Sequence, residues 1–229
     1  MSARMIVAAA LALAIAGGAQ AATLDSYSEK QLVTALRGAL EKGASDAVLK
    51  LGKADGYLGD PKVRIPLPGA VAKHEKTLRK LGLGKQTDAL LASMNRAAES
   101  AVPEAKALVL DAVKTMSVDD ARRILAGPDD AATQYFQTRT REPLTKKLLP
   151  LVQKATAQAK VAKAYESLAG KAAKYGLIKA EDAQLDAWVT RKALDGLFLT
   201  IADNERAIRK DPTKAATNLL RDVLGALKR

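Results

Sequence analysis

The sequence predicts an all-α protein: a single-domain multi-helix bundle with one extended Gly/Pro-rich strap at about residues 52–69. Aromatic residues make up only 3% of the chain, and Ala, Leu and Val dominate its apolar residues, which favours close-packed helices over strands. Helix start and stop residues also recur almost from end to end. Residues 22–229 are enough for one sizeable hydrophobic core, so we expect a single domain there.

Residues 1–21 are predicted to be a signal peptide. Arg4 supplies a positive charge, residues 5–16 form an apolar run, and Ala19-Gln20-Ala21 is the small-x-small pattern of a cleavage site. The run of 12 residues is shorter than the about 20 that cross a bilayer, so cleavage after Ala21 is favoured over anchoring. We therefore expect a periplasmic protein, with secretion or an N-terminal membrane tether as the alternatives.

The first helices are placed by capping residues. Ser26 and Glu29 have the spacing of a capping box, which predicts a helix that ends at Gly43. A second, short helix is expected over residues 45–51. The two would lie directly before the strap.

Glycines and prolines crowd residues 52–69. Because residues before proline favour extended backbone, we expect residues 62–65 to form a strap or a short strand. Helices resume over residues 70–81, and then over residues 87–116 with a bend at Pro103.

Three further helix starts are expected in the second half of the chain. Ser117 and Asp120 begin a helix that ends at Gly127, and Asp129 or Asp130 caps the next one. A last helix is expected to begin at Asp211-Pro212.

Between these starts, Pro143, Pro150 and Gly170 are expected to break up the chain as far as residue 175. A long helix over residues 185–210 follows.

Catalytic and metal-binding templates fail on residue counts. The chain has no Cys, which excludes disulfides, a thiol nucleophile and a lipid-attachment cysteine. His74 is its only histidine, so the pair His74-Glu75 cannot complete a zinc-protease motif, which needs a second histidine one helical turn away. The acidic pairs at residues 119–120 and 129–130 are interpreted as helix caps rather than cation ligands. We therefore expect no metal and no cofactor.

Positive charge is concentrated in two segments. Of the net charge of +12, residues 61–100 carry +5 and residues 141–180 carry +7, while the other segments are close to neutral. An exported protein meets lipid phosphates, lipopolysaccharide and anionic wall polymers, not nucleic acid. The expected partner is therefore an anionic envelope component or another envelope protein.

Five short segments carry a resemblance to a known family: Gly56-Tyr57-Leu58-Gly59, Val63-Arg64-Ile65-Pro66-Leu67-Pro68, Asn95-Arg96-Ala97-Ala98-Glu99, Ala131-Ala132-Thr133-Gln134-Tyr135-Phe136 and Ala193-Leu194-Asp195-Gly196-Leu197-Phe198. In this order they resemble the bacterial exported family catalogued as domain of unknown function 4197. The resemblance spans about residues 30–228 and implies an all-helical exported domain without an established activity. Many members resemble lipoproteins, and this chain departs from them because it lacks Cys.

Six polar residues are candidates for a binding or catalytic site: Arg64, Asn95, Glu99, Tyr135, Glu205 and Arg209. Glu205 falls on the apolar face of the helix at residues 185–210, where a carboxylate must be paired or have a raised pKa; Arg209 or Arg64 could pair with it. Asn95 and Glu99 share a polar stripe that we interpret as solvated, with a site as the alternative. If the six residues form a site, they should converge on one cavity.

Four lysines project to one side of a helix if Gly170 does not interrupt it: Lys160, Lys163, Lys171 and Lys174. A basic amphipathic helix of this kind is able to lie against anionic headgroups. A merely solvated helix face is the simpler interpretation, and both remain open.

Two functional hypotheses follow. The favoured one is a non-catalytic envelope protein that binds an anionic or protein partner through its basic segments, with binding that weakens as salt is added. The alternative is an enzyme or small-ligand-binding protein whose polar pocket lies between the helices and the strap at residues 62–68.

Overall fold

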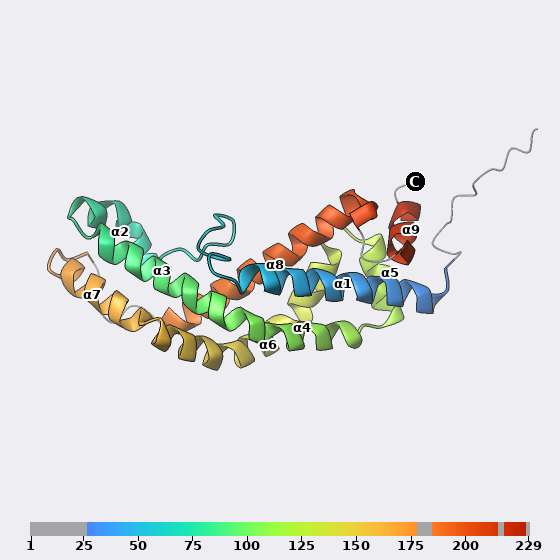
Figure 1. The fold of residues 1–229 in the computed structure, drawn as a ribbon, viewed down its shortest axis with the longest axis horizontal. Coiled ribbons are helices and arrows are strands. Elements are labelled where there is room, and N and C mark those ends of the chain that lie inside the picture. The colour runs from blue at the N-terminus through green and yellow to red at the C-terminus, as the bar shows by residue number, and fades with distance from the viewer. Residues whose placement is uncertain (1–26, 178–184, 215–217, 228–229) are drawn as a thin grey trace, which may run out of the picture.

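The structure, a computed structural model, describes residues 27–177, 185–214 and 218–227 (Figure 1). Within these ranges it contains helices and no strand, which confirms the all-α prediction. The predicted signal peptide lies outside the described residues. The elements are α1 (Glu29–Leu51), α2 (Gly69–Lys80), α3 (Gly84–Ala101), the 3₁₀ segment η2 (Val102–Glu104), α4 (Ala105–Lys114), α5 (Val118–Ala126), α6 (Ala131–Gln158), α7 (Val161–Ala173), α8 (Leu185–Lys210), the 3₁₀ segment η3 (Pro212–Lys214) and α9 (Asn218–Leu227).

The bundle is elongated (Figure 1). Among the described helices, α6 and α8 share the most extensive contact, and α3 packs against α6 and α7. α2 folds back on α3, whereas α1 packs against α4, α5, α8 and α9. As a result, α2 and α7 lie at one end of the long axis, and α5 and α9 lie toward the other.

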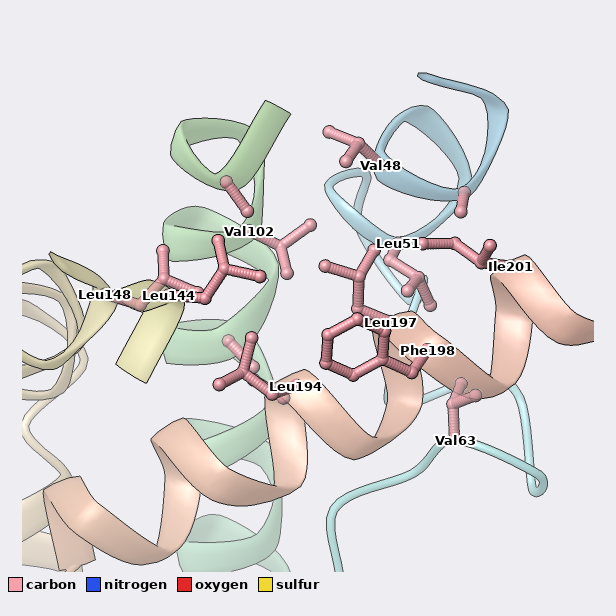
Figure 2. Close-up of a cluster of buried hydrophobic side chains, with 14 of the residues drawn as sticks. Val48, Leu51, Val63, Val102, Leu144, Leu148, Leu194, Leu197, Phe198 and Ile201 are labelled. Atoms are coloured by element: carbon pink, nitrogen blue, oxygen red, sulfur yellow. The ribbon is translucent and has the colours of Figure 1, made fainter. Parts of the chain in front are cut away.

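The middle of the bundle is held by aliphatic packing around Phe198, whose ring is fully buried. Figure 2 shows that the side chains around this ring come from α1, the strap, η2, α6 and α8. Burial of each large apolar side chain contributes about 1.5–3 kcal/mol. The labelled members of this cluster are Val48, Leu51, Val63, Val102, Leu144, Leu148, Leu194, Leu197, Phe198 and Ile201.

α1 begins later than predicted and does not end at Gly43. Its N-cap is Ser28 rather than Ser26: the Ser28 Oγ accepts the Gln31 N–H, and the Gln31 side chain accepts the Ser28 N–H at 2.9 Å. Gly43 is buried inside α1, so the predicted break and the separate helix over residues 45–51 are wrong. A glycine costs a helix only about 1 kcal/mol, and the long buried face of α1 outweighs that cost.

The local signals in the middle of the chain are confirmed. η2 separates α3 from α4 at the expected bend, where Pro103 stands. Ser117 caps α5 in a capping box with Asp120, and Gly127 ends the helix. α8 has the predicted bounds, and residues 62–65 form a strap without a strand.

The predicted breaks at Pro143, Pro150 and Gly170 are wrong, because α6 runs through both prolines and α7 through the glycine. The prolines are exposed and seven residues apart, so their rings share the outer side of α6, while Leu144 and Leu148 are buried. A proline inside a helix costs about 3 kcal/mol, and packing of the buried side along α8 offsets it. After α8, Pro212 begins a 3₁₀ segment rather than an α-helix.

Candidate functional site

The six polar candidates do not converge; they divide into two groups. Arg64, Asn95 and Glu99 lie at the strap: Asn95 and Glu99 bind it to α3, and Arg64 donates to the Leu58 carbonyl within the strap. Tyr135, Glu205 and Arg209 lie where α5, α6 and α8 meet. No hydrogen bond or ion pair joins the two groups within the described residues.

Glu99 anchors the first part of the strap. Its Oε1 accepts the N–H groups of Tyr57 and Leu58, each at 3.1 Å, and its Oε2 pairs with Arg96 at 2.7 Å. Arg96 in turn reaches Asp55, which has a left-handed backbone with φ of 63°. The buried carboxylate of Glu99 therefore satisfies strap N–H groups that have no helix or sheet partner.

Asn95 anchors the second part in the same manner. Its Oδ1 accepts the Ile65 N–H at 2.8 Å, and its Nδ2 donates to the Ile65 carbonyl at 3.0 Å. This is the two-bond pattern that a neighbouring strand would offer. Because Asn95 and Glu99 are buried, the interpretation of their stripe as solvated is wrong at these two positions.

The strap is also fixed to α8. The Tyr57 ring is fully buried, and its hydroxyl donates to the Ala193 carbonyl at 2.7 Å. Burial, with the nearby Glu99 carboxylate, raises the pKa of Tyr57 far above its ordinary value, so the hydroxyl stays a donor. Gly196 makes room for the ring, since a Cβ there would lie 2.7 Å from Tyr57 Cε1. Trp188 Nε1 donates to the Pro66 carbonyl at 3.0 Å.

Glu205 is the N-terminal cap of α6, supplied from α8. Its carboxylate accepts the N–H groups of Ala132 and Thr133, each at 3.0 Å, and the Thr133 hydroxyl at 2.9 Å. Asp130 occupies the N-cap position but forms no side-chain cap, so the prediction that Asp129 or Asp130 would cap α6 is wrong. No local pattern could reveal this cap, because more than 70 residues separate Glu205 from the amides.

Arg209 is the partner of Glu205, and Arg64 is not. The Arg209 guanidinium lies 3.0 Å from Glu205 Oε1, and the two side chains are only 13% and 8% exposed. Arg209 also donates to the Ile124 carbonyl at 2.7 Å, which ties α8 to the end of α5. The expectation that a carboxylate at residue 205 must be paired is thus met by an ion pair with a structural role.

Tyr135 belongs to the cap of α5. Its hydroxyl donates to Asp120 at 3.3 Å. Burial would raise the pKa of Asp120, but hydrogen bonds from the Ser117 hydroxyl and N–H, with the charges of Arg139 and Arg123, lower it to about 2. Asp120 was expected to act as a cap, and the structure shows that it also fixes Tyr135.

Three hollows of the described surface are lined by different candidates, and one of about 500 Å³ between α6, α7 and α8 is lined by none of them. Arg64 lines one of about 240 Å³ between the strap and α8, and Tyr135 lines one of about 400 Å³ between α5 and α6. Glu205 and Arg209 line an apolar cavity of about 40 Å³, which is far smaller than the roughly 300–1,000 Å³ of a ligand pocket. Asn95 and Glu99 line none of the three.

Two features are absent from the described residues. No three His, Asp or Glu side chains in these ranges lie close enough to hold a metal ion. Among the described helices, none combines the length and apolar character that a membrane span requires.

The basic segments, unlike the polar candidates, come together in space. α2 and α7 belong to different halves of the sequence, but they lie at the same end of the molecule (Figure 1). Both helices pack against α3. Residues 73–88 and 160–174, which we call the cationic end, hold nine Lys or Arg against three Asp or Glu. Their net charge of +6 is half of the chain's +12.

Gly170 does not interrupt α7, and Lys163 and Lys171 lie within this helix, whereas Lys160 and Lys174 flank it as its N-cap and C-cap, and Lys160 has a left-handed backbone with φ of 54°. Val161, Tyr165, Leu168 and Ala172 are buried on one side of α7. The ammonium groups of Lys160, Lys163, Lys171 and Lys174 are exposed and pair with no other described residue. These charges are therefore available to a partner.

Fold and sites together define an elongated all-α protein whose buried polar residues are engaged in holding its own backbone. Residues 26–225 match the family described as Protein of unknown function (DUF4197), and the chain belongs to that family. No curated protein and no solved structure matches the chain. The segments that carried the resemblance include Tyr57, Asn95, Glu99 and Gly196, which dock the strap.

Proposed function

We propose that this is a non-catalytic helical protein of the bacterial envelope that binds an anionic partner through its cationic end. The observation that carries the proposal is the meeting of two basic segments, distant in sequence, at one end of the bundle (Figure 1). Clustered charge of one sign raises the local concentration of an oppositely charged partner and speeds its association.

The state of the lysines supports this site. Carboxylates elsewhere on the described surface are mostly used in ion pairs, such as Asp46 with Lys42 and Asp195 with Arg141. In the cationic end, Arg79 pairs with both Glu75 and Asp88, and the neighbouring lysines have no carboxylate partner in the described part of the chain. Among the described residues, the excess charge is thus not neutralised.

The envelope location is supported by the predicted signal peptide at residues 1–21. A non-catalytic role is supported by the candidate polar residues, each of which is hydrogen-bonded to backbone or to a cap. The alternative of a polar pocket under the strap required these residues to converge, and they do not.

The test is binding of the chain from residue 22 onward to vesicles of anionic phospholipid, to lipopolysaccharide and to soluble polyphosphate, measured over a range of salt concentrations. Binding to at least one is expected, and log K should fall linearly with log salt. In one variant four of the exposed lysines of the cationic end, those in residues 160–174, are replaced by glutamine: Lys160, Lys163, Lys171 and Lys174.

A matched control removes the same number of exposed charges outside the cationic end: Lys30, Lys53, Lys106 and Lys147 to glutamine. The first variant should bind at least tenfold more weakly and with a shallower salt slope than the control. No binding at low salt, or equal losses in the two variants, would contradict the proposal.

A further inference from the structure

The cationic end carries the same four-residue pattern twice. The last residue of α2 begins the segment Lys80-Leu81-Gly82-Leu83, and α7 is followed directly by Lys174-Tyr175-Gly176-Leu177. In both, a lysine precedes a large apolar residue, and a glycine and a leucine follow. We call Leu81 and Tyr175 the two tips.

The two patterns also share a backbone geometry. Gly82 and Gly176 are the described glycines with positive φ, at 80° and 67°. After each glycine the leucine N–H returns to the preceding helix, from Leu83 to the Leu78 carbonyl at 2.9 Å and from Leu177 to the Ala172 carbonyl at 3.3 Å. This is the Schellman motif, in which the residue after the glycine packs back on the helix.

The motif buries one apolar residue of each pattern and exposes the other. Leu83 is buried and Leu177 packs against the core, but Leu81 is 38% exposed and Tyr175 is 55% exposed. Only four large apolar residues of the described chain are exposed, and two of them are these tips. Because the α2–α3 turn and the end of α7 lie at the same end of the molecule (Figure 1), both tips lie at this end: Leu81 is within the cationic end, and Tyr175 directly follows its last residue.

Four exposed lysines lie within four residues of the tips in the sequence. The exposed ammonium groups of Lys80, Lys85, Lys171 and Lys174 pair with no other described residue. A soluble polyanion would be bound by the lysines alone, and the exposed apolar groups would add nothing. A bilayer interface matches both, since lysines reach the phosphates while leucine and tyrosine enter the boundary between headgroups and acyl chains.

Resting on the proposed function, we infer that the anionic partner is a phospholipid surface, which the cationic end meets with Leu81 and Tyr175 inserted at the interface. The contact is peripheral and reversible, because two side chains enter the boundary and no helix crosses it. Charge supplies the attraction, and the tips select a bilayer over a soluble polyanion.

The absence of Cys from the chain makes a direct test possible, because a single introduced cysteine is the only labelling site. The chain from residue 22 onward is prepared as Leu81→Cys, Tyr175→Cys or the control Leu49→Cys, each with a polarity-sensitive fluorophore. Leu49 is 66% exposed and lies on α1, outside the cationic end. The probes are vesicles of anionic phospholipid, vesicles of zwitterionic phospholipid and soluble polyphosphate.

Anionic vesicles should shift the emission to the blue at residues 81 and 175 but not at 49, and polyphosphate should shift none. An unlabelled Leu81→Ser/Tyr175→Ser variant should bind anionic vesicles about tenfold more weakly and bind polyphosphate unchanged. The control Leu49→Ser should leave both affinities as they are.

The failures can be told apart. Vesicle binding without a shift at the tips, or polyphosphate binding without vesicle binding, overturns the lipid inference and leaves the proposed function standing. Binding to no anionic probe, lipopolysaccharide included, overturns both. A blue shift that grows with protein concentration in the absence of lipid would show instead that the tips join two copies of the chain.

Discussion

Glu205 provides the sharpest test of how the bundle is held together. Substitution Glu205→Gln keeps the shape of the side chain but removes the charge that caps α6 and neutralises Arg209. The glutamine side chain can accept a hydrogen bond with its single oxygen, but its NH₂ group cannot accept one from a backbone N–H. At least one of the Ala132 and Thr133 N–H groups therefore loses its acceptor. The guanidinium of Arg209, only 13% exposed, is left with its backbone carbonyl partners.

Breaking a buried ion pair by changing one partner costs about 3–5 kcal/mol, and a hydrogen bond to a charged group contributes about 1.5–3 kcal/mol. Because the glutamine oxygen still accepts part of the cap, we expect the free energy of unfolding to fall by about 3 kcal/mol. Urea unfolding followed by circular dichroism measures this change. The double variant Glu205→Gln/Arg209→Met should be less destabilised than the sum of the two single variants.

Glu142→Gln is the matched control. Glu142 and Lys146 have the same i,i+4 spacing as Glu205 and Arg209 and lie 2.7 Å apart, but both side chains are exposed. Such surface pairs add little to stability, so the control should have the same free energy of unfolding as the wild type. If Glu205→Gln behaves like the control, or if the double variant is strictly additive, the cap from α8 does not stabilise α6 as argued.

Three more predictions concern stability and are checked by the same unfolding assay. Gly43→Ala should raise the free energy of unfolding by about 1 kcal/mol or more, because the added Cβ meets no atom within 4 Å and would line the small apolar cavity. The control Gly38→Ala is equally unhindered, and its gain in stability measures the contribution of helix propensity alone. Gly196→Ala should have the opposite sign and destabilise by about 1–3 kcal/mol, since its Cβ would lie 2.7 Å from the fixed ring of Tyr57. The pKa of Asp120 is about 2 in the folded protein against a usual 3.8, so the stabilisation by its carboxylate is complete above about pH 4 and is lost as the pH falls toward 2. This loss amounts to about 2 kcal/mol in the free energy of unfolding, and Asp120→Asn should remove this part of the pH dependence. Each prediction has an outcome that contradicts it: a lower free energy of unfolding in Gly43→Ala, a higher one in Gly196→Ala, or an unchanged dependence of stability on pH between about 4 and 2 in Asp120→Asn.

Local signals predicted the fold well wherever the deciding contacts are local. The cap of α5 joins Ser117 and Asp120, three residues apart, and the bounds of α8 follow from an uninterrupted apolar face. Gly43, Pro143 and Pro150 were misjudged because their cost is local, whereas the packing that offsets it comes from other helices.

The sequence singled out the polar residues as candidates, but it predicted neither their contacts nor their division into two groups. Glu205 was marked by its place on an apolar face, yet its ligands are the amides of a helix more than 70 residues away. Asn95 and Glu99 were read as a solvated stripe, although the strap's own backbone could have indicated otherwise: a chain without ladder partners must find its hydrogen bonds in side chains. The meeting of the two basic segments depends on α3 lying between them, which no sequence pattern encodes.

The central claim is that a partner meets the end formed by α2 and α7. Hydrogen–deuterium exchange of the chain from residue 22 onward, with and without anionic phospholipid vesicles at low salt, tests it most directly. Slower exchange is predicted at residues 76–85 and 160–177, with little change in α5 and α9 at the other end. Protection confined to α5 and α9, or spread evenly over the chain, would contradict the account.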